Sequence, residues 1–209
     1  MARYTDPSCR QCRRIGEKLF LKGERCYTPR CAVERRKKPP GDRSFRRRRA
    51  SEWSLQLREK QKARFTYGVM ERQFRKYFEM ARKRSGVTGD QLLQLLERRL
   101  DNVVFRLSFA ESRKQGRQLV SHGHITVNGR RMDVPSYLVE TGDVIKWKSS
   151  NGSVPGFAKA IMESGSRRTV PGWLKPDPEN GAAEVLGEPE TAHLDTDIDV
   201  RLIVEFYSK

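Results

Sequence analysis

The chain has 209 residues, a net charge of +17 and a pI of about 10.2, enough length for one or two domains with their own cores. No stretch approaches the roughly 18 consecutive apolar residues of a membrane span, and the basic residues form no single amphipathic stripe for lipid. The excess of Lys and Arg therefore favours a nucleic-acid partner. Residues 1–50 hold 17 basic and 5 acidic side chains, whereas residues 151–209 hold 6 and 10. Phosphate contacts are expected in the first two thirds of the chain, because carboxylates repel phosphate.

The four cysteines all lie in the first 31 residues, in the pattern Cys9-x2-Cys12-x13-Cys26-x4-Cys31. Two short-spaced pairs about a dozen residues apart are typical of a structural tetrahedral zinc site. No apolar signal-peptide core precedes them, so we expect a reducing compartment, which disfavours two disulfides. Ligand type alone does not distinguish zinc from an iron–sulfur cluster. We predict that these thiolates bind Zn²⁺, with the cluster, or oxidised or metal-free thiols, as alternatives.

A strongly basic arm follows the cysteines. Its Pro39-Pro40-Gly41 sequence cannot lie inside a helix, so we expect an extended segment between two blocks of charge. Such charge density is typical of a segment that is disordered alone and becomes ordered when it binds a partner of opposite charge. The RNA contacts predicted in this part of the chain are Arg3, Arg10, Arg13, Arg14, Arg35, Arg36, Arg46, Arg47, Arg48 and Arg49.

Helical periodicity begins at Ser51, which can cap a helix from Glu52 to Tyr67, and a second helix is expected from about Glu71 to Arg84. Thr88-x-x-Gln91 is a capping box that opens the longest apolar stripe, so one helix is predicted through residue 107. Asp101 would then lie in the middle of that helix. Further RNA-contact candidates in these helices are Arg58, Lys60, Lys62 and Arg72.

The next elements form a helix followed by a small sheet. Ser112-x-x-Gln115 opens a helix that ends before Gly123, and the periodicity then changes from 3.6 to 2. Asn128-Gly129 is a strong hairpin signal between strands at 124–127 and 130–134, and 144–147 predicts another strand. Residues 149–197 predict only a short helix near 157–162 and a strand near Trp173. The apolar segment 200–207 is expected to pack back onto the body.

The helix after Ser112 is the sharpest binding candidate. Its N-terminal amides and positive dipole suit phosphate, and the hairpin beside it would complete a concave basic edge. Folded RNA, which is recognised by shape and 2′-OH contacts, fits such an edge. The alternative is a helix whose basic side chains are merely solvated. The predicted contacts are Arg113, Lys114, Arg117, Gln118, His122, Asn128 and Arg130.

Three stretches carry a resemblance to the alpha-L RNA-binding module: LDNVVFRL at 100–107, SRKQGRQLV at 112–120 and GHITVNG at 123–129. ARY at 2–4, LREKQK at 57–62, ERQFR at 71–75 and IVEFYS at 203–208 extend the similarity. Residues 1–148 and the last ten residues together resemble the family of the fourth protein of the bacterial small ribosomal subunit.

The resemblance implies an α+β fold in which the module, a helix pair with a small antiparallel sheet, is inserted into an all-helical domain. The expected parts are a zinc-clamped basic arm at 1–45, a helical domain at 46–98 completed by 199–209, and the module with a poorly matched loop region at 99–198. Some family members carry the four cysteines as a zinc site. The chain departs from the family at Gly116, where alanine is usual, after Pro40-Gly41, where His-Gly is missing, and over 149–197.

The function implied by the resemblance is direct binding of small-subunit rRNA in the cytoplasmic ribosome and nucleation of assembly of the subunit body. Arg46–Arg49 would contact mRNA where it enters the subunit, and contacts with neighbouring ribosomal proteins would influence decoding accuracy. Neither a membrane nor a small-molecule substrate is expected as a partner.

Two other functions compete with this one. Pseudouridine synthases carry the same module and use an Asp in an Arg-Leu-Asp context, which Arg99-Leu100-Asp101 matches superficially. However, no catalytic domain of roughly 200 residues follows, and His122, His124 and His193 are too scattered for an active site. A zinc-ribbon DNA-binding regulator would need a dimer seam or a recognition helix, and neither is visible. We therefore predict that the chain is not an enzyme.

Overall fold

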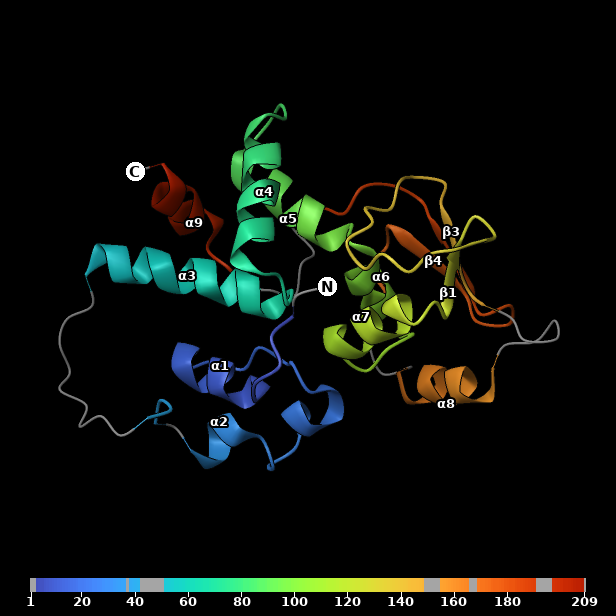
Figure 1. The fold of residues 1–209 in the computed structure, drawn as a ribbon, viewed down its shortest axis with the longest axis horizontal. Coiled ribbons are helices and arrows are strands. Elements are labelled where there is room, and N and C mark those ends of the chain that lie inside the picture. The colour runs from blue at the N-terminus through green and yellow to red at the C-terminus, as the bar shows by residue number, and fades with distance from the viewer. Residues whose placement is uncertain are drawn as a thin grey trace. The chain divides into compact units, whose positions relative to one another are not determined.

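The structure is a computed structural model that describes residues 3–36, 38–41, 51–148, 155–165, 169–190 and 197–208 (Figure 1). The predicted contacts Arg46, Arg47, Arg48 and Arg49 lie outside these residues. The chain forms two compact units. Unit 1 consists of residues 1–92 and 195–209, and unit 2 consists of residues 93–194. The first unit is therefore built from both ends of the chain.

Unit 1 begins with a small folded part, residues 3–36 and 38–41, which we call the N-terminal segment. It contains three short helices: α1 (Ser8–Ile15), the 3-10 helix η1 (Gly23–Tyr27) and α2 (Ala32–Arg35). Helix α1 ends at Gly16, whose left-handed φ of 86° suits glycine. A small core packs against Val33 and Phe65 and consists of Cys12, Ile15, Leu19 and Leu21. Apolar contacts therefore contribute to the fold of this segment, alongside its cysteines.

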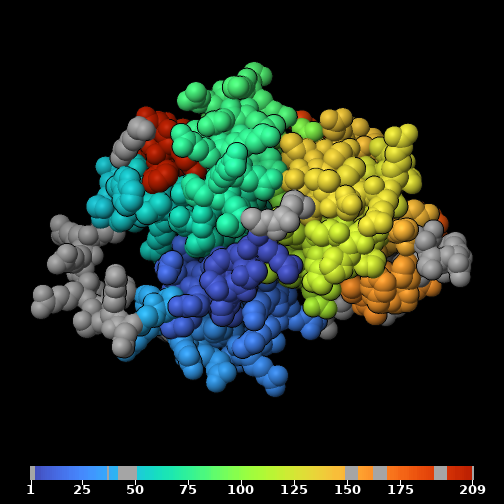
Figure 2. Space-filling model, in the orientation of Figure 1, coloured from blue at the N-terminus to red at the C-terminus, as the bar shows by residue number. Residues whose placement is uncertain are grey.

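The rest of unit 1 is helical: α3 (Glu52–Thr66), α4 (Glu71–Arg82), the first half of α5 (Thr88–Glu97), and α9 (Val200–Tyr207). The Ser51 Oγ accepts a hydrogen bond from the Ser54 N–H at 3.3 Å, which confirms the predicted cap of α3. The C-terminal α9 packs against α3, as the red and cyan surfaces in Figure 2 show. The rings of Phe78 and Tyr207 stack at 4.6 Å, so the end of the chain completes this helical core.

The prediction of one long helix from Thr88 to residue 107 is wrong. Helix α5 ends at Glu97, and a separate helix α6 (Leu100–Arg106) begins after Arg99, whose φ of −65° and ψ of 133° are extended. The Leu100 N–H donates to the Tyr137 carbonyl at 2.8 Å, which takes up a backbone donor at the break. The apolar periodicity continues across the break because both helices bury the same stripe. Asp101 therefore lies in the first turn of α6.

Unit 2 contains a five-stranded antiparallel sheet with the order β2-β1-β3-β5-β4. The strands are β1 (Ile125–Val127), β2 (Arg130–Arg131), β3 (Val144–Trp147), β4 (Leu174–Asp177) and β5 (Ala182–Val185). Asn128 and Gly129, with φ of 51° and 76°, form the tight turn of the predicted hairpin. The buried Ile125 and Trp147 alternate with less buried neighbours and face a core shared with α6 and with α7 (Arg113–Ser121).

The described residues between 155 and 190 contain more regular structure than their composition predicted. Helix α8 (Gly156–Gly165) and strand β4 correspond to the expected helix and strand, whereas β5 was not predicted. Two of the four residues of β5, AAEV, are adjacent and both buried, so the strand lacks the strict alternation of apolar and polar residues that predicts a half-buried strand. Helices and a small antiparallel sheet together give the expected α+β class. Within the described ranges, none of the helices is both long and apolar enough to cross a membrane.

Candidate nucleic-acid interface

Helix α7 of unit 2 begins with the predicted capping arrangement. The Ser112 Oγ accepts from the Gln115 N–H at 3.3 Å, and the Gln115 Oε1 accepts from the Glu111 N–H at 2.7 Å. The two side chains satisfy backbone donors on both sides of the helix start. They fix where the helix begins and so which basic side chains occupy its first turns.

One face of α7 carries exposed polar side chains four residues apart. Lys114, Gln118 and His122 are all exposed, and their spacing places them on the same side of the helix. In the hairpin, Asn128 and Arg130 are exposed as well. Five of the predicted contacts in unit 2 are thus exposed to solvent.

The two other predicted arginines of α7 are partly buried and held by unit 2 itself. Arg113 Nε donates to Asn102 Oδ1 at 2.7 Å, and the Arg113 guanidinium lies 4.5 Å from the ring centre of Phe105. Arg117 Nη1 lies 3.2 Å from Asp101 Oδ2. Their guanidinium groups are therefore oriented before any ligand binds, which reduces the entropy lost on contact.

A buried polar network in α5 and α6 supports these arginines, and sequence reasoning missed it. Asp101 also pairs with the fully buried Arg99, whose Nη2 lies 2.6 Å from Asp101 Oδ2. In a second cluster, the buried Glu97 accepts from Arg106 Nη2 at 2.9 Å and from Asn102 Nδ2 at 2.8 Å. Asn102 joins this cluster to Arg113. Paired and hydrogen-bonded charges of this kind impose one geometry on the helices that carry them.

The predicted contact Asn128 has a structural role in the hairpin. Its Nδ2 donates to Asp143 Oδ1 at 2.8 Å, and its Oδ1 accepts from the Val144 N–H at 2.9 Å. These bonds fasten the β1–β2 turn to the start of β3. Behind the turn, Arg131 lies over Gly123, where an added Cβ would stand 2.2 Å from the Arg131 Nε.

The predicted contacts of the N-terminal segment and α4 are mostly exposed. Arg13 is the exception, because its Nε donates to the Lys38 carbonyl at 3.0 Å and its Nη2 to the Pro39 carbonyl at 3.3 Å. Arg13 thereby fastens the described part of the basic arm to α1. The exposed members of the set are Arg3, Arg10, Arg14, Arg35, Arg36 and Arg72.

The three basic candidates of α3 make contacts inside unit 1. Arg58 Nη2 donates to the Ile15 carbonyl at the end of α1. The buried Lys60 lies 2.7 Å from Glu71 Oε1, and the buried Lys62 lies 2.7 Å from Glu17 Oε2. Direct RNA contact by these lysines stays a prediction, whereas their observed contacts join α3 to neighbouring parts of the unit.

None of the four cysteines forms a disulfide. Cys12, Cys26 and Cys31 are buried. Burial raises the pKa of the Cys12 thiol, and Cys26, Cys9 and Cys31 raise it further. The Cys26 Sγ accepts from the Lys22 N–H at 3.3 Å. Sulfur donors in this number suit Zn²⁺ chemically. However, no group of three or more His, Cys, Asp or Glu side chains among the described residues is arranged to hold a metal ion, so the zinc-clamped form of the arm is not supported.

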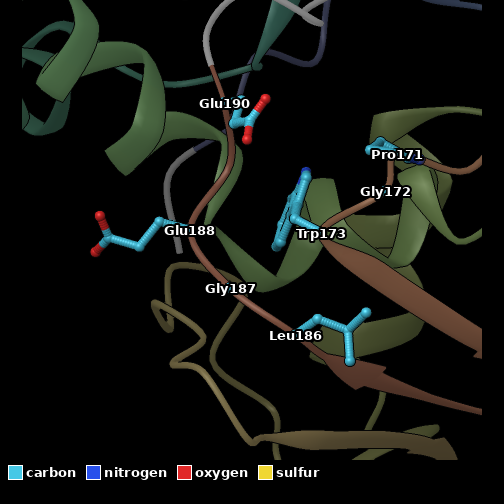
Figure 3. A pocket seen from close by; sticks show the side chains of 7 residues that line it. All are labelled: Pro171, Gly172, Trp173, Leu186, Gly187, Glu188 and Glu190. Atoms are coloured by element: carbon cyan, nitrogen blue, oxygen red, sulfur yellow. The ribbon is translucent and has the colours of Figure 1, made fainter.

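A pocket of about 480 Å³ in unit 2 lies against β4 and β5. Figure 3 shows the indole of Trp173 standing between Glu190 and Pro171. Leu186 and Glu188 also line it, and the indole Nε1 has no hydrogen-bond partner among the described residues. Its apolar and acidic lining is unsuited to phosphate, so the pocket is not part of the candidate interface.

Comparisons with known proteins cover the whole chain. Residues 3–97 match the family described as "Ribosomal protein S4/S9 N-terminal domain", and residues 98–145 match the S4 domain. The chain is 54% identical to the small ribosomal subunit protein uS4A of Symbiobacterium thermophilum over the full length of both. It is 52% identical to uS4 of Pelotomaculum thermopropionicum and 54% identical to uS4 of Ruminiclostridium cellulolyticum, again over all of each chain. The chain therefore belongs to the uS4 family of small ribosomal subunit proteins.

Proposed function

We propose that this protein is a structural component of the small ribosomal subunit that binds small-subunit rRNA directly and catalyses no reaction. The observation that carries the proposal is identity of 52–54% over the full length of relatives named small ribosomal subunit protein uS4. The protein would act in the cytoplasm as part of the ribosome, with rRNA and neighbouring ribosomal proteins as partners.

Binding would combine attraction to phosphate with recognition of RNA shape. The exposed charges of Lys114 and Arg130 would attract RNA phosphates, and the positive end of the α7 dipole would add to this attraction. Arg113 and Arg117, held from behind by α6, would reach the RNA in a fixed orientation. The hairpin is fastened to β3 by Asn128, so it would meet the RNA in a preorganised form as well.

Chemical footprinting of the protein on small-subunit rRNA tests this function. We expect protection of one compact multi-helix region, and weaker binding as salt concentration rises, because Lys and Arg release counterions from phosphates. Competition at fixed salt between the structured rRNA and duplex DNA provides the control. Equal affinity for the two would contradict the proposal and favour a general nucleic-acid binder.

The two competing functions are not supported. A pseudouridine synthase would need the Asp of its Arg-Leu-Asp motif at the target base. In this chain Asp101 is 3% exposed and paired with Arg99 and Arg117. Its carboxylate is committed to the packing of α6 and α7. A DNA-binding regulator with a zinc ribbon has no support from eight full-length relatives, which carry the name uS4 or uS4A.

We further propose that the protein nucleates assembly of the subunit body and that Arg46–Arg49 contact mRNA where it enters the subunit, with an influence on decoding accuracy. The support is the family resemblance and the dense charge of this stretch. Replacing all four arginines with alanine should leave the rRNA footprint of unit 2 intact and reduce crosslinking of mRNA to the protein in assembled subunits. Unchanged crosslinking would remove the mRNA role.

We also propose that Cys9, Cys12, Cys26 and Cys31 hold Zn²⁺, which when bound would supply a cationic cross-link among four thiolates. The support is the spacing of the ligands, the burial of three thiols and the N–H donated to Cys26. Elemental analysis of the purified protein should give about one zinc per chain, and visible absorption would reveal an iron–sulfur cluster instead. Absence of metal from protein purified under reducing conditions would contradict the site.

A further inference from the structure

The N-terminal segment carries an exposed aromatic pair that the sequence analysis did not single out. The rings of Phe20 and Tyr27 stack with their centres 4.9 Å apart and their planes at 28°. Phe20 is 38% exposed and Tyr27 is 66% exposed, although both belong to a segment that has a small core nearby. The stack covers one face of the Tyr27 ring, and the high exposure leaves much of the ring open to a ligand.

The backbone holds Phe20 outward in an unfavourable conformation. Its φ of 49° is left-handed, which is an outlier for a bulky side chain. The residues on either side, Leu19 and Leu21, are both buried in the small core. The left-handed residue between them therefore turns its ring out of the core. Strained conformations of this kind persist where the surrounding structure fixes them, and they concentrate at functional sites.

The Tyr27 ring is also mounted on a fixed part of the backbone. It follows the buried Cys26 at the end of η1, and the Cys26 Sγ accepts from the Lys22 N–H at 3.3 Å. This bond closes the loop that connects the two aromatic residues. Both aromatic residues therefore have buried neighbours in the sequence that hold them in place, which makes the stack a preorganised surface.

The charge around this stack favours RNA as its ligand. Lys22, Arg25 and Arg30 lie in the same stretch and are exposed, and Glu24 is the exposed acid among them. These cations attract a phosphate backbone, and the aromatic rings provide a flat surface on which a base can stack. Unpaired bases stack on Tyr and Phe rings in RNA-binding proteins, and this contact tolerates any base because each has a π face.

We infer that Tyr27, backed by Phe20, is a stacking platform for an unpaired base of the small-subunit rRNA. The inference rests on the proposed function and adds an uncharged contact to the charged interface of unit 2. The competing interpretation is that the two rings only shield the small core of the N-terminal segment from water. In that case their removal would change the stability of the segment but not its affinity for RNA.

The test compares Tyr27→Leu with the matched control Tyr27→Phe in the full-length protein. Binding is measured to folded small-subunit rRNA and to a fully paired RNA duplex over a range of salt concentrations. We expect Tyr27→Leu to bind the folded rRNA about 5- to 140-fold more weakly, as loss of one stacked base predicts. Tyr27→Phe should stay within about 2-fold of the wild type, since it keeps the ring. The salt slope should not change in either variant, because no charge is removed.

A second variant separates a binding defect from a folding defect. Phe20→Asn removes the ring beneath Tyr27 and places at this position a residue that tolerates positive φ. We expect it to fold, as judged by circular dichroism and by the number of reactive thiols, and to bind folded rRNA more weakly than the wild type. Wild-type affinity in both Tyr27→Leu and Phe20→Asn would overturn the inference. An equal loss on duplex RNA, or a lower salt slope, would also overturn it. If the wild type does not prefer rRNA to duplex DNA, the proposed function itself fails.

Discussion

Replacing Gly116 with alanine should destabilise this protein. Gly116 lies in α7 where that helix crosses the first turn of α6, and a Cβ added there would stand 2.7 Å from the Asp101 carbonyl oxygen. Ordinary contact begins at 3.4 Å, and the obstructing atom is backbone, so α6 and α7 must move apart. Helix propensity alone predicts that Gly116→Ala stabilises the protein by up to about 1 kcal/mol. Overpacking of a buried site costs about 1–3 kcal/mol.

The net expectation is that Gly116→Ala lowers the free energy of unfolding of unit 2 by about 1 kcal/mol. Urea unfolding followed by hydrogen exchange of the α6 and α7 amides measures the change in unit 2. Lys114→Ala, at an exposed position of the same helix, is the control and should be nearly neutral. If Gly116→Ala raises the free energy of unfolding by the amount that propensity predicts, the close approach of the two helices is not a constraint.

Three further predictions concern charge and metal. Lys114→Ala should weaken rRNA binding and reduce the salt slope of that binding by about one unit. Arg117→Ala should reduce this slope by less, because the carboxylate of Asp101 already pairs with Arg117. Cys12→Ser should increase hydrogen exchange in the N-terminal segment and leave α3 and α4 protected; loss of protection in all helices would contradict a local role. Burial raises the pKa of Glu71, but hydrogen bonds, first of all from Lys60, outweigh this effect and hold its pKa below the usual value. The resulting stability is present above the ordinary pKa of glutamate, near 4.3, and is lost as pH falls below it, so Glu71→Gln should unfold with a weaker pH dependence in acid.

Local sequence signals predicted the elements around the candidate interface well. Ser51 and Ser112 cap the helices that they were expected to cap, and Asn128-Gly129 forms the hairpin turn. These signals succeed because each depends on hydrogen bonds or dihedral angles within a few residues. The break at Arg99 was not predictable in this way. Its extended backbone is held by contacts with residues 137 and 138, which are distant in the sequence.

The candidate site was predicted less completely, because charge alone does not reveal the partner. Lys60 and Lys62 have the composition of phosphate contacts, yet the fold places a carboxylate beside each of them. Arg117 is similar, since its partner Asp101 is 16 residues away and becomes a neighbour only when α6 packs on α7. Phe20 was missed for another reason. An aromatic residue between two leucines is expected to be buried, and only its positive φ turns it outward.

The contacts of α9 also determine when unit 1 can complete its fold during synthesis. Gln56 Nε2 donates to Glu205 Oε2 at 2.9 Å across 149 residues, and the Tyr207 hydroxyl lies 2.9 Å from Glu71 Oε1. Helices near the beginning of the chain therefore cannot complete their packing until α9 has been made, whereas every residue of unit 2 precedes α9 in the sequence. A chain that stops before residue 200 contains all of unit 2 but lacks the helix that closes unit 1.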